Sequence, residues 1–371
     1  MNFEFPEELI ALRDEFRGFV ADHKPIELVR RGLDGQQPCD LALWKKTAEL
    51  GWTGTTIAEA YGGTALGYEL LCLVAEECGR TLVPLPFSSA VYLASEAIQL
   101  AGTEAQKQSY LPRIVAGAVA TFALAEGPGD PDASDIKTAA TAGSISGVKM
   151  PVLDADVGEF AVVAAREGSN VGLYLVDLRG PGVERQGLES LDPSRSLSKV
   201  TFKDAPAERL GEGKGDWSVI RAILERAAIL LSFEQLGGAQ ACLDMATEYA
   251  KQRYAFGRPI GSFQAIKHRL ADVYVAVELA RANAYYGAWA ISAGAADLAI
   301  AAASTRVCAT AAFEFASKEN IQVHGGVGCT WEYDCHLYYR RSKLLGLMLG
   351  GPSYWKNYLI DQLEASDAGK S

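Results

Sequence analysis

The sequence predicts a mainly α-helical protein with a central β domain, because its residue pattern changes twice along the chain. Apolar residues recur at helical spacing from Pro6 to about Gly117, with short breaks at glycine and proline. Glycine, proline, aspartate and serine then become frequent, and the helical spacing returns from about Asp216. The domains that this pattern predicts are residues 1–117 (all-helical), 118–212 (β) and 213–371 (helical bundle).

Short runs of β-branched and aromatic residues predict the strands of the central domain. Residues 160–164 (FAVVA) and 171–176 (VGLYLV) are such runs. The tripeptide Gly-Pro-Gly at 127–129 and again at 180–182 is a turn signal beside them. This alternation of short strands and turns is typical of a small β domain.

The last third of the chain predicts an antiparallel helical bundle. Ile266, Leu270, Val273 and Val277 share one face of a helix for which Ser262 is the expected N-cap. Small residues let helices approach one another closely, and alanine is abundant here. The helices expected are residues 217–251, 262–293 and 296–320.

Composition restricts the class of protein. With 49% hydrophobic and 22% charged positions among 371 residues, the chain can bury a large core. Lys and Arg number 35 against 46 Asp and Glu, which gives a formal charge of -11. A nonspecific phosphate-binding surface is not expected from this charge, so nucleic acid is a poor candidate partner.

The sequence also predicts a cytoplasmic location. Seven cysteines occur without a C-x-x-C pair, which indicates reduced thiols. The acidic N-terminus reads as a first helix and not as a signal peptide. Residues 290–304 are weakly polar but include Asp297, so we expect no membrane span.

Two segments near the C-terminus carry the strongest functional signal. Residues 252–264 read QRYAFGRPIGSFQ, and residues 322–332 read QVHGGVGCTWE. Together they resemble the acyl-CoA dehydrogenase family of flavoproteins. Residues 50–63 and 74–87 look like the N-terminal helices of that family. The resemblance spans nearly the whole chain and implies an N-terminal helical bundle, a middle β-barrel-like domain and a C-terminal four-helix bundle.

The resemblance implies FAD as the cofactor, contacted across a subunit boundary. In the family, the Arg-x-x-Phe-Gly turn and a later Gln reach FAD held by the neighbouring subunit, and the Gln-x-x-Gly-Gly segment passes near its adenosine half. Arginine offers a forked cation for a diphosphate, phenylalanine a flat stacking face, and glycine an open backbone. The cofactor-binding residues implied here are Arg253, Phe256, Gln264, Gln322, Gly325 and Gly326.

The resemblance further implies an oxidoreductase of lipid metabolism that desaturates a CoA thioester between its α and β carbons. In the family, a Glu carboxylate removes the α-proton while hydride passes to the flavin. The expected partners are an acyl-CoA substrate, an electron-transfer flavoprotein or similar acceptor, and further subunits. A dimer or tetramer, homomeric or with a sibling subunit, follows from the shared cofactor site.

The catalytic Glu of the family is not found at either of its usual places. Leu349 or Gly350 occupies the first place, and neither can accept a proton. Ala227 occupies the second, with Glu225 displaced by two residues, a turn of about 200° on a helix. Glu234 lies seven residues beyond Ala227 on the same face, in an apolar run.

Both Glu225 and Glu234 therefore remain candidate bases, each with a structural alternative. Glu225 could be a carboxylate at the exposed start of a helix. A carboxylate at Glu234 would need a hydrogen bond or an ion pair if it is buried.

The β domain departs from the family at the flavin ring. Ala125 stands where members have Thr or Ser to bond the ring. Pro151, Val152 and Leu153 replace the common Trp-x-Thr. The aromatic wall and both hydroxyl groups are thus missing, while the intersubunit half of the cofactor site is intact.

Three hypotheses follow. The chain is an acyl-CoA dehydrogenase with an unusual base, or a non-catalytic subunit that completes the FAD site of a catalytic sibling, or a flavoprotein with other chemistry. The asymmetry resembles bacterial dehydrogenases built from two different chains. The sequence Gly-Gly-Pro at 350–352 also looks like members that act on steroids and other bulky substrates.

A metal site is not expected. Cys329, Cys335 and His336 match no common zinc spacing, and a fourth ligand is not apparent. His324 and His268 are expected to be hydrogen-bonded structural residues.

Overall fold

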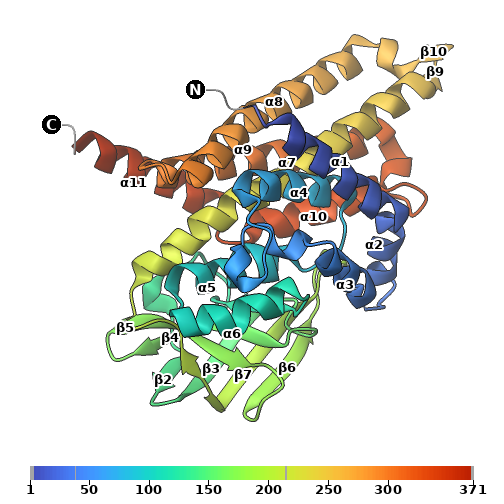
Figure 1. Ribbon diagram of the computed structural model, residues 1–371. Coiled ribbons are helices and arrows are strands. Elements are labelled where there is room, and N and C mark those ends of the chain that lie inside the picture. Colours follow the sequence, from blue (N-terminus) through green and yellow to red (C-terminus); the bar gives the residue numbers. More distant parts are fainter. Residues whose placement is uncertain (1–3, 38, 214, 369–371) are drawn as a thin grey trace. The chain divides into compact units, whose positions relative to one another are not determined.

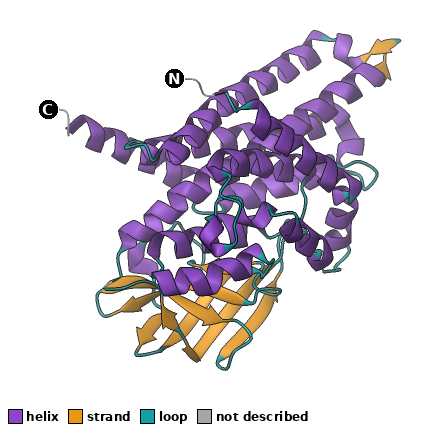
Figure 2. Cartoon of the chain, viewed as in Figure 1, coloured by secondary structure: helices purple, strands orange, loops and turns teal. Residues whose placement is uncertain are grey.

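The computed structural model describes residues 4–37, 39–213 and 215–368, and it confirms the mainly α fold class with a central β domain (Figures 1 and 2). The chain forms two compact units. The first comprises residues 1–29, 68–83 and 228–371, and the second comprises 30–67 and 84–227. Each unit is assembled from separate stretches of the chain, and the domain boundaries near 117 and 212 stay a prediction.

Helices of the second unit begin where the sequence provides caps. Asp40 accepts hydrogen bonds from the backbone N–H groups of Ala42 and Leu43. Thr103 and Gln106 form a reciprocal capping box. The helical elements are α3 (Leu41–Glu49), η1 (Trp52–Gly54), η2 (Glu59–Tyr61), the π-helix η3 (Phe87–Ser95), α5 (Glu96–Ala101), α6 (Glu104–Val115) and η4 (Ala133–Asp135); α2 (Pro25–Leu33) runs from one unit into the other.

One eight-stranded sheet forms the rest of the second unit. Its strands are β1 (Ala120–Ala123), β2 (Ala139–Thr141), β3 (Ser144–Leu153), β4 (Phe160–Glu167), β5 (Asn170–Asp177), β6 (Val183–Leu188), β7 (Leu197–Pro206) and β8 (Glu208–Arg209). The order is β6-β7-β3-β2-β4-β5-β8, and β1 pairs with β4. Pairs of β4 with β1 and β2 are parallel and the others are antiparallel. Both predicted strand runs lie in β4 and β5.

The ladder between β3 and β7 is irregular, and one of its two register shifts includes Pro151. Its register shifts between Lys149 and Val152. Pro151 lies in this interval and has no N–H to donate to a neighbouring strand. The bulge and the proline therefore occur together at the position that differs from the family.

Long helices build the first unit. They are α1 (Glu7–Asp22), α4 (Gly67–Thr81), α7 (Trp217–Gln252, from Ala228 onward), α8 (Gln264–Ala293), α9 (Leu298–His324), α10 (Cys335–Leu347) and α11 (Pro352–Ala368), with η6 (Gly325–Cys329) after α9. Gly294 ends α8 at φ +59°, and α9 begins four residues later, so the two helices pack antiparallel (Figure 1).

The expected N-cap of α8 is wrong. Ser262 lies in the short helix η5 (Ile260–Ser262), α8 begins at Gln264, and its capping position, Phe263, makes no side-chain hydrogen bond to the helix. The Ser262 hydroxyl is buried without a hydrogen-bond partner. A local turn thus overrides the capping preference of serine.

One stretch, Leu298–Cys329, is long and apolar enough to cross a membrane by length and composition. Half of it is buried, and α8, α10 and α11 pack against α9. This burial is typical of the core helix of a bundle.

The contact of α4 with α7 is the tightest in the first unit. A methyl group on Gly79 would overlap the carbonyl oxygen of Glu234, and one on Gly237 would overlap that of Glu76. A methyl group on Gly238 would overlap the ring of Phe313. Only glycine permits the two backbones to approach this closely.

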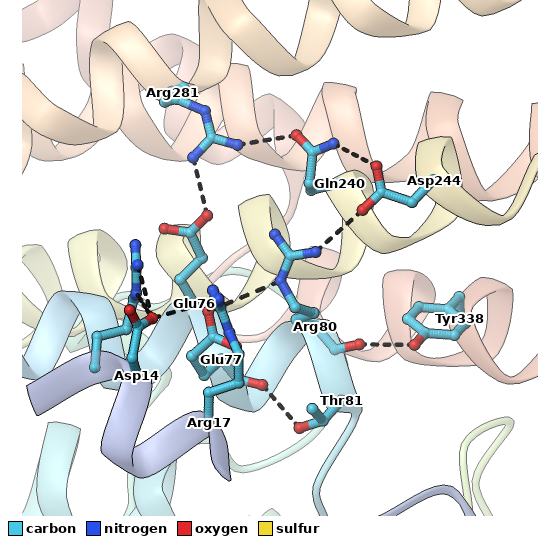
Figure 3. A network of polar contacts seen from close by, with 11 residues as sticks. Asp14, Arg17, Glu76, Glu77, Arg80, Thr81, Gln240, Asp244, Arg281 and Tyr338 are labelled. Atoms are coloured by element: carbon cyan, nitrogen blue, oxygen red, sulfur yellow. Dashed lines mark hydrogen bonds and ion pairs between the residues drawn. The ribbon is translucent and has the colours of Figure 1, made fainter. Parts of the chain in front are cut away.

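Ion pairs surround this contact (Figure 3). Glu77 accepts two hydrogen bonds from Arg17 of α1, at 2.6 and 2.9 Å. Glu76 accepts one from Arg281 of α8 at 2.9 Å. Since both carboxylates are buried, their cations supply the charge that burial requires.

Gly237→Ala is expected to destabilise the protein by about 2–3 kcal/mol, because the added methyl group must displace a helix backbone. Chemical denaturation measures the change in the free energy of unfolding. Gly18→Ala in α1 is the matched control, since no atom from outside its own helical turn lies within 4 Å of its methyl position. That substitution is expected to stabilise by up to about 1 kcal/mol. Equal effects of the two substitutions would contradict the close-contact argument.

Candidate functional site

A β-hairpin carries the first motif. Strands β9 (Tyr254–Ala255) and β10 (Arg258–Pro259) pair antiparallel, with Arg258 opposite Ala255. The hairpin projects at the end of α7 and the start of α8 (Figure 1). Phe256 and Gly257 form its two-residue turn, with φ of +54° and +77°. Two positive φ angles are typical of a type I′ turn, in which Asn-Gly is the preferred pair.

Phe256 is costly in this position. A bulky side chain at positive φ is strained by about 1–3 kcal/mol. Its ring is also 96% exposed, so no burial within the chain offsets the strain. Phe256 therefore combines a strained backbone with an exposed aromatic ring at the tip of the hairpin.

Two residues that the sequence analysis did not single out support this tip. The ring of Phe263 meets that of Phe256 edge to face, with centroids 6.3 Å apart. The guanidinium of Arg258 lies 4.1 Å from the centroid of Phe263. In the sequence, the signal that could have identified Phe263 is its place directly before Gln264 of the motif.

The second motif lies at the end of α9. Gly325 leaves the helix at φ +66°, and neither Gly325 nor Gly326 has an atom within 4 Å of its methyl position. Gly328 differs, because a methyl group there would press on the carbonyl oxygen of Ile321. Gly325 and Gly326 thus offer an open backbone, and Gly328 serves packing.

An apolar cluster joins the two motifs. Val323 packs with Ala250 of α7 and with residues that flank the hairpin. The flanking residues are Ile260, Ile266 and Leu270. The structure therefore brings the hairpin and the glycine segment together, and all six predicted cofactor-binding residues are exposed on this unit: Arg253, Phe256, Gln264, Gln322, Gly325 and Gly326.

His324 supports the glycine segment. Its ring stacks on Tyr249 at 4.1 Å, and its Nδ1 lies 2.8 Å from the carbonyl oxygen of Asn320. Burial lowers the pKa of His324. A neutral ring that donates from Nδ1 to the carbonyl fits these contacts, which are structural.

The second unit holds the positions where the family contacts the flavin ring. Glu126 accepts hydrogen bonds from Lys149 at 2.7 Å and from the backbone of Lys137 and Thr138. Burial lowers the pKa of Lys149 to about 8, against the opposing charge of Glu126. Glu126 is thus committed to this pair and is not available as a base.

Side-chain donors are absent at the neighbouring positions. Ala125 has no polar side chain, and its backbone carbonyl oxygen accepts from Met150 N at 2.8 Å. Pro151 is exposed, and Val152 is buried in the core of the sheet. Neither an aromatic wall nor a hydroxyl group is provided by these three residues.

The turn at which many family members place the base is built around an apolar residue. Leu349 adopts φ +61°, and Gly350 follows at +103°. Leu349 packs in a cluster with Trp355, whose Nε1 donates to the carbonyl oxygen of Leu349 at 3.1 Å. Position 349 serves packing here.

Arg306 fixes the same turn from α9. Its guanidinium donates to the carbonyl oxygens of Leu345 and Met348 and to Oε1 of Gln235. Burial lowers the pKa of Arg306 to about 9, and the charge of Glu234 opposes that shift. The sequence analysis did not identify Arg306, since its partners are distant in sequence.

The two candidate bases lie in different surroundings on α7. Glu234 is 2% exposed, and its backbone takes part in the contact with α4. Glu225 is half-buried, while the equivalent place at Ala227 is fully buried. Their catalytic roles stay predictions.

Among the described residues, no group of three or more His, Cys, Asp or Glu side chains could hold a metal ion. Cys335 is buried and its Sγ contacts Oδ1 of Asn320, whereas Cys329 is exposed.

Comparisons with known proteins identify the family of the chain. A family model for the acyl-CoA dehydrogenase N-terminal domain matches residues 6–118, and one for the C-terminal domain matches residues 213–354. The chain is 32% identical to acyl-CoA dehydrogenase IpdE2 of Mycobacterium tuberculosis over 348 residues, which cover 94% of both chains.

Two solved structures share the fold. The Tcur3481-Tcur3483 steroid ACAD matches with a TM-score of 0.89 and 30% identity, covering 98% of this chain and 99% of the other. The ChsE4-ChsE5 complex of Mycobacterium tuberculosis matches with a TM-score of 0.89 and 26% identity, at the same coverage. The chain therefore belongs to the acyl-CoA dehydrogenase family, whose members bind FAD.

Proposed function

We propose that this chain is one subunit of an FAD-dependent acyl-CoA dehydrogenase and completes the FAD site of a sibling chain, a second chain of the same fold that carries the carboxylate base. The carrying observation is Phe256, which is held in a strained conformation with 96% of its surface exposed. A ring in this state has a role only when another molecule covers it.

The residues present fit one half of the cofactor. Arg253 would pair with the diphosphate, Phe256 would stack on a flat ring, and Gln264 would hydrogen-bond a polar edge. Gly325 and Gly326 would let the backbone approach the adenosine half. Bound FAD supplies the hydride acceptor for desaturation of the CoA thioester.

The other half of the site is expected on the sibling chain. Leu349 cannot accept the α-proton, and Ala125 and Pro151 offer no hydroxyl to a flavin ring. In the mixed oligomer, the sibling chain would hold the ring and remove the proton. Two structural relatives, the Tcur3481-Tcur3483 steroid ACAD and the ChsE4-ChsE5 complex, each pair two differently named proteins, which supports a mixed assembly.

An apolar face of α8 supports association next to the hairpin. Tyr274, Val275 and Leu279 are large apolar side chains that are more than half exposed. They lie on the helix that begins at Gln264, and exposed apolar patches of this kind mark protein interfaces. We therefore assign this face to the sibling chain, in a dimer or tetramer.

Related members support the remaining assignments. The steroid enzyme among the relatives favours a CoA thioester with a bulky, steroid-type acyl group as substrate. An electron-transfer flavoprotein or a similar protein would reoxidise the flavin, as the family resemblance implies. All seven cysteines are free, which favours the reducing cytoplasm.

The purified lone chain is expected to be colourless, and the mixed oligomer is expected to contain bound flavin. Visible spectra, the flavin-to-protein ratio and native mass measure this. Stoichiometric flavin in the lone chain, bleached by a CoA thioester, would instead support catalysis by this chain. In that case Glu225→Gln and Glu234→Gln identify the base, through a loss of about 10²- to 10⁴-fold in kcat.

Phe256→Asn is expected to raise stability while lowering FAD affinity in the mixed oligomer. Asparagine before glycine suits a type I′ turn, so the free energy of unfolding should rise by about 1 kcal/mol. The aromatic stacking face is lost at the same time. Denaturation of the lone chain and FAD titration of the oligomer measure the two effects, and unchanged FAD affinity would argue against the proposed contact.

Leu279→Asp is expected to dissociate the mixed oligomer, because it places a charge in an apolar interface. Light scattering measures the native mass. Leu191→Asp is a matched control, since Leu191 is 54% exposed and Leu279 is 60% exposed. A native mass that responds equally to both substitutions would exclude a specific interface on α8.

A further inference from the structure

We propose that Arg258 is a second cation for the diphosphate of the nucleotide and that Phe263 positions it. This inference rests on the proposed function and adds two residues to the same site. It starts from the hairpin register, in which Arg258 directly follows the turn glycine and faces Ala255.

The position of the Arg258 guanidinium over Phe263 leaves its donors free for a ligand. Its Cζ lies over the Phe263 ring, 4.1 Å from the centroid. A guanidinium held over an aromatic face by a cation–π contact keeps all of its N–H donors in its own plane. Those donors then suit a forked acceptor such as a diphosphate.

Phe263 links this cation to the exposed tip. The same ring contacts Phe256 edge to face. Arg258, Phe263 and Phe256 thus form a continuous row of planar groups on the hairpin. A ligand that stacks on Phe256 and carries a diphosphate would meet both an aromatic face and a cation.

The surrounding charge favours an anion. Among the residues that the structure describes, no carboxylate pairs with Arg253 or Arg258. The chain as a whole has 46 acidic residues against 35 basic ones, yet neither of these two arginines has an acidic partner in the described part of the chain. An anion from outside would balance them.

The start of α8 adds to this positive charge. The helix has no side-chain cap and no acidic residue in its first turn, and that turn contains Lys267. Its free N–H groups carry a partial positive charge, so a lysine there is unfavourable in the isolated chain. A diphosphate near this end would reverse that cost.

An acidic side chain of the sibling chain could offer similar chemistry to Arg258. The nucleotide is favoured because Arg258 and Phe256 share the supporting ring of Phe263 and lie on the same hairpin. The two sources are separated by measuring nucleotide affinity and subunit association independently.

The test uses the mixed oligomer after removal of flavin, titrated with FAD and, separately, with ADP, which has the diphosphate but no flavin ring. Arg258→Ala is expected to raise Kd for both about ten- to a hundredfold, with native mass unchanged. Arg258→Lys should retain part of the affinity. Phe263→Leu should raise Kd about two- to fivefold, because the cation remains but is no longer positioned.

Arg179→Ala is the matched control, since Arg179 is an exposed arginine on the other unit, and its Kd for FAD should equal that of the unaltered protein. Unchanged Kd in Arg258→Ala would overturn the inference. If Arg258→Ala lowers the native mass of the oligomer but leaves Kd for FAD and ADP unchanged, the inference is overturned, and Arg258 instead pairs with a carboxylate of the sibling chain. Absence of flavin from the unaltered mixed oligomer would contradict the proposed function itself.

Discussion

The contact between the backbones of α4 and α7 is the constraint on which the first unit depends. Gly79 and Gly237 bring carbonyl groups of each helix into the place of a side chain on the other. Because the helices are this close, side chains near the glycines become buried. Glu76 and Glu77, which lie shortly before Gly79, are among them. Burying two carboxylates side by side is possible because Arg281 and Arg17 reach them from α8 and α1 (Figure 3). The close contact of α4 with α7 thus accounts for the ion pairs that join α4 to α1 and α8.

The same arrangement supports the hairpin. The glycine contact and the Arg281 pair hold α7 and α8, and the hairpin joins the end of one to the start of the other. A strained turn persists only where its surroundings hold it in place. The apolar cluster around Val323 adds support from α9. Stability stored in the bundle therefore offsets the conformational cost of Phe256 at the tip.

Much of this structure could be predicted from local sequence. Alanine-rich periodicity indicated the extents of α7, α8 and α9 to within a few residues. The six cofactor-binding residues implied by the family resemblance are all exposed, and their role stays a prediction. The features that escaped prediction depend on distant partners. Ser262 is a preferred N-cap residue, yet it lies in the short helix η5 and does not cap α8. The contact between Arg258 and Phe263 forms only when the hairpin is folded. Arg306 holds residues about forty positions away.

The distribution of strain and burial supports the proposal that cofactor contact and catalysis are divided between two chains. Two non-glycine residues at functional positions adopt positive φ, Phe256 and Leu349. The strain at Leu349 is offset within the chain, since its side chain packs in the cluster of Trp355 and its carbonyl oxygen accepts a hydrogen bond from Trp355. Within the described chain the Phe256 ring gains only its edge-to-face contact with Phe263, because 96% of Phe256 is exposed, so the turn is held by the rest of the bundle and not by burial of its own side chain. A turn at Leu349 that packs within the chain and a turn at Phe256 whose ring is exposed both fit the proposal that this chain keeps the cofactor contact while a sibling chain carries the base.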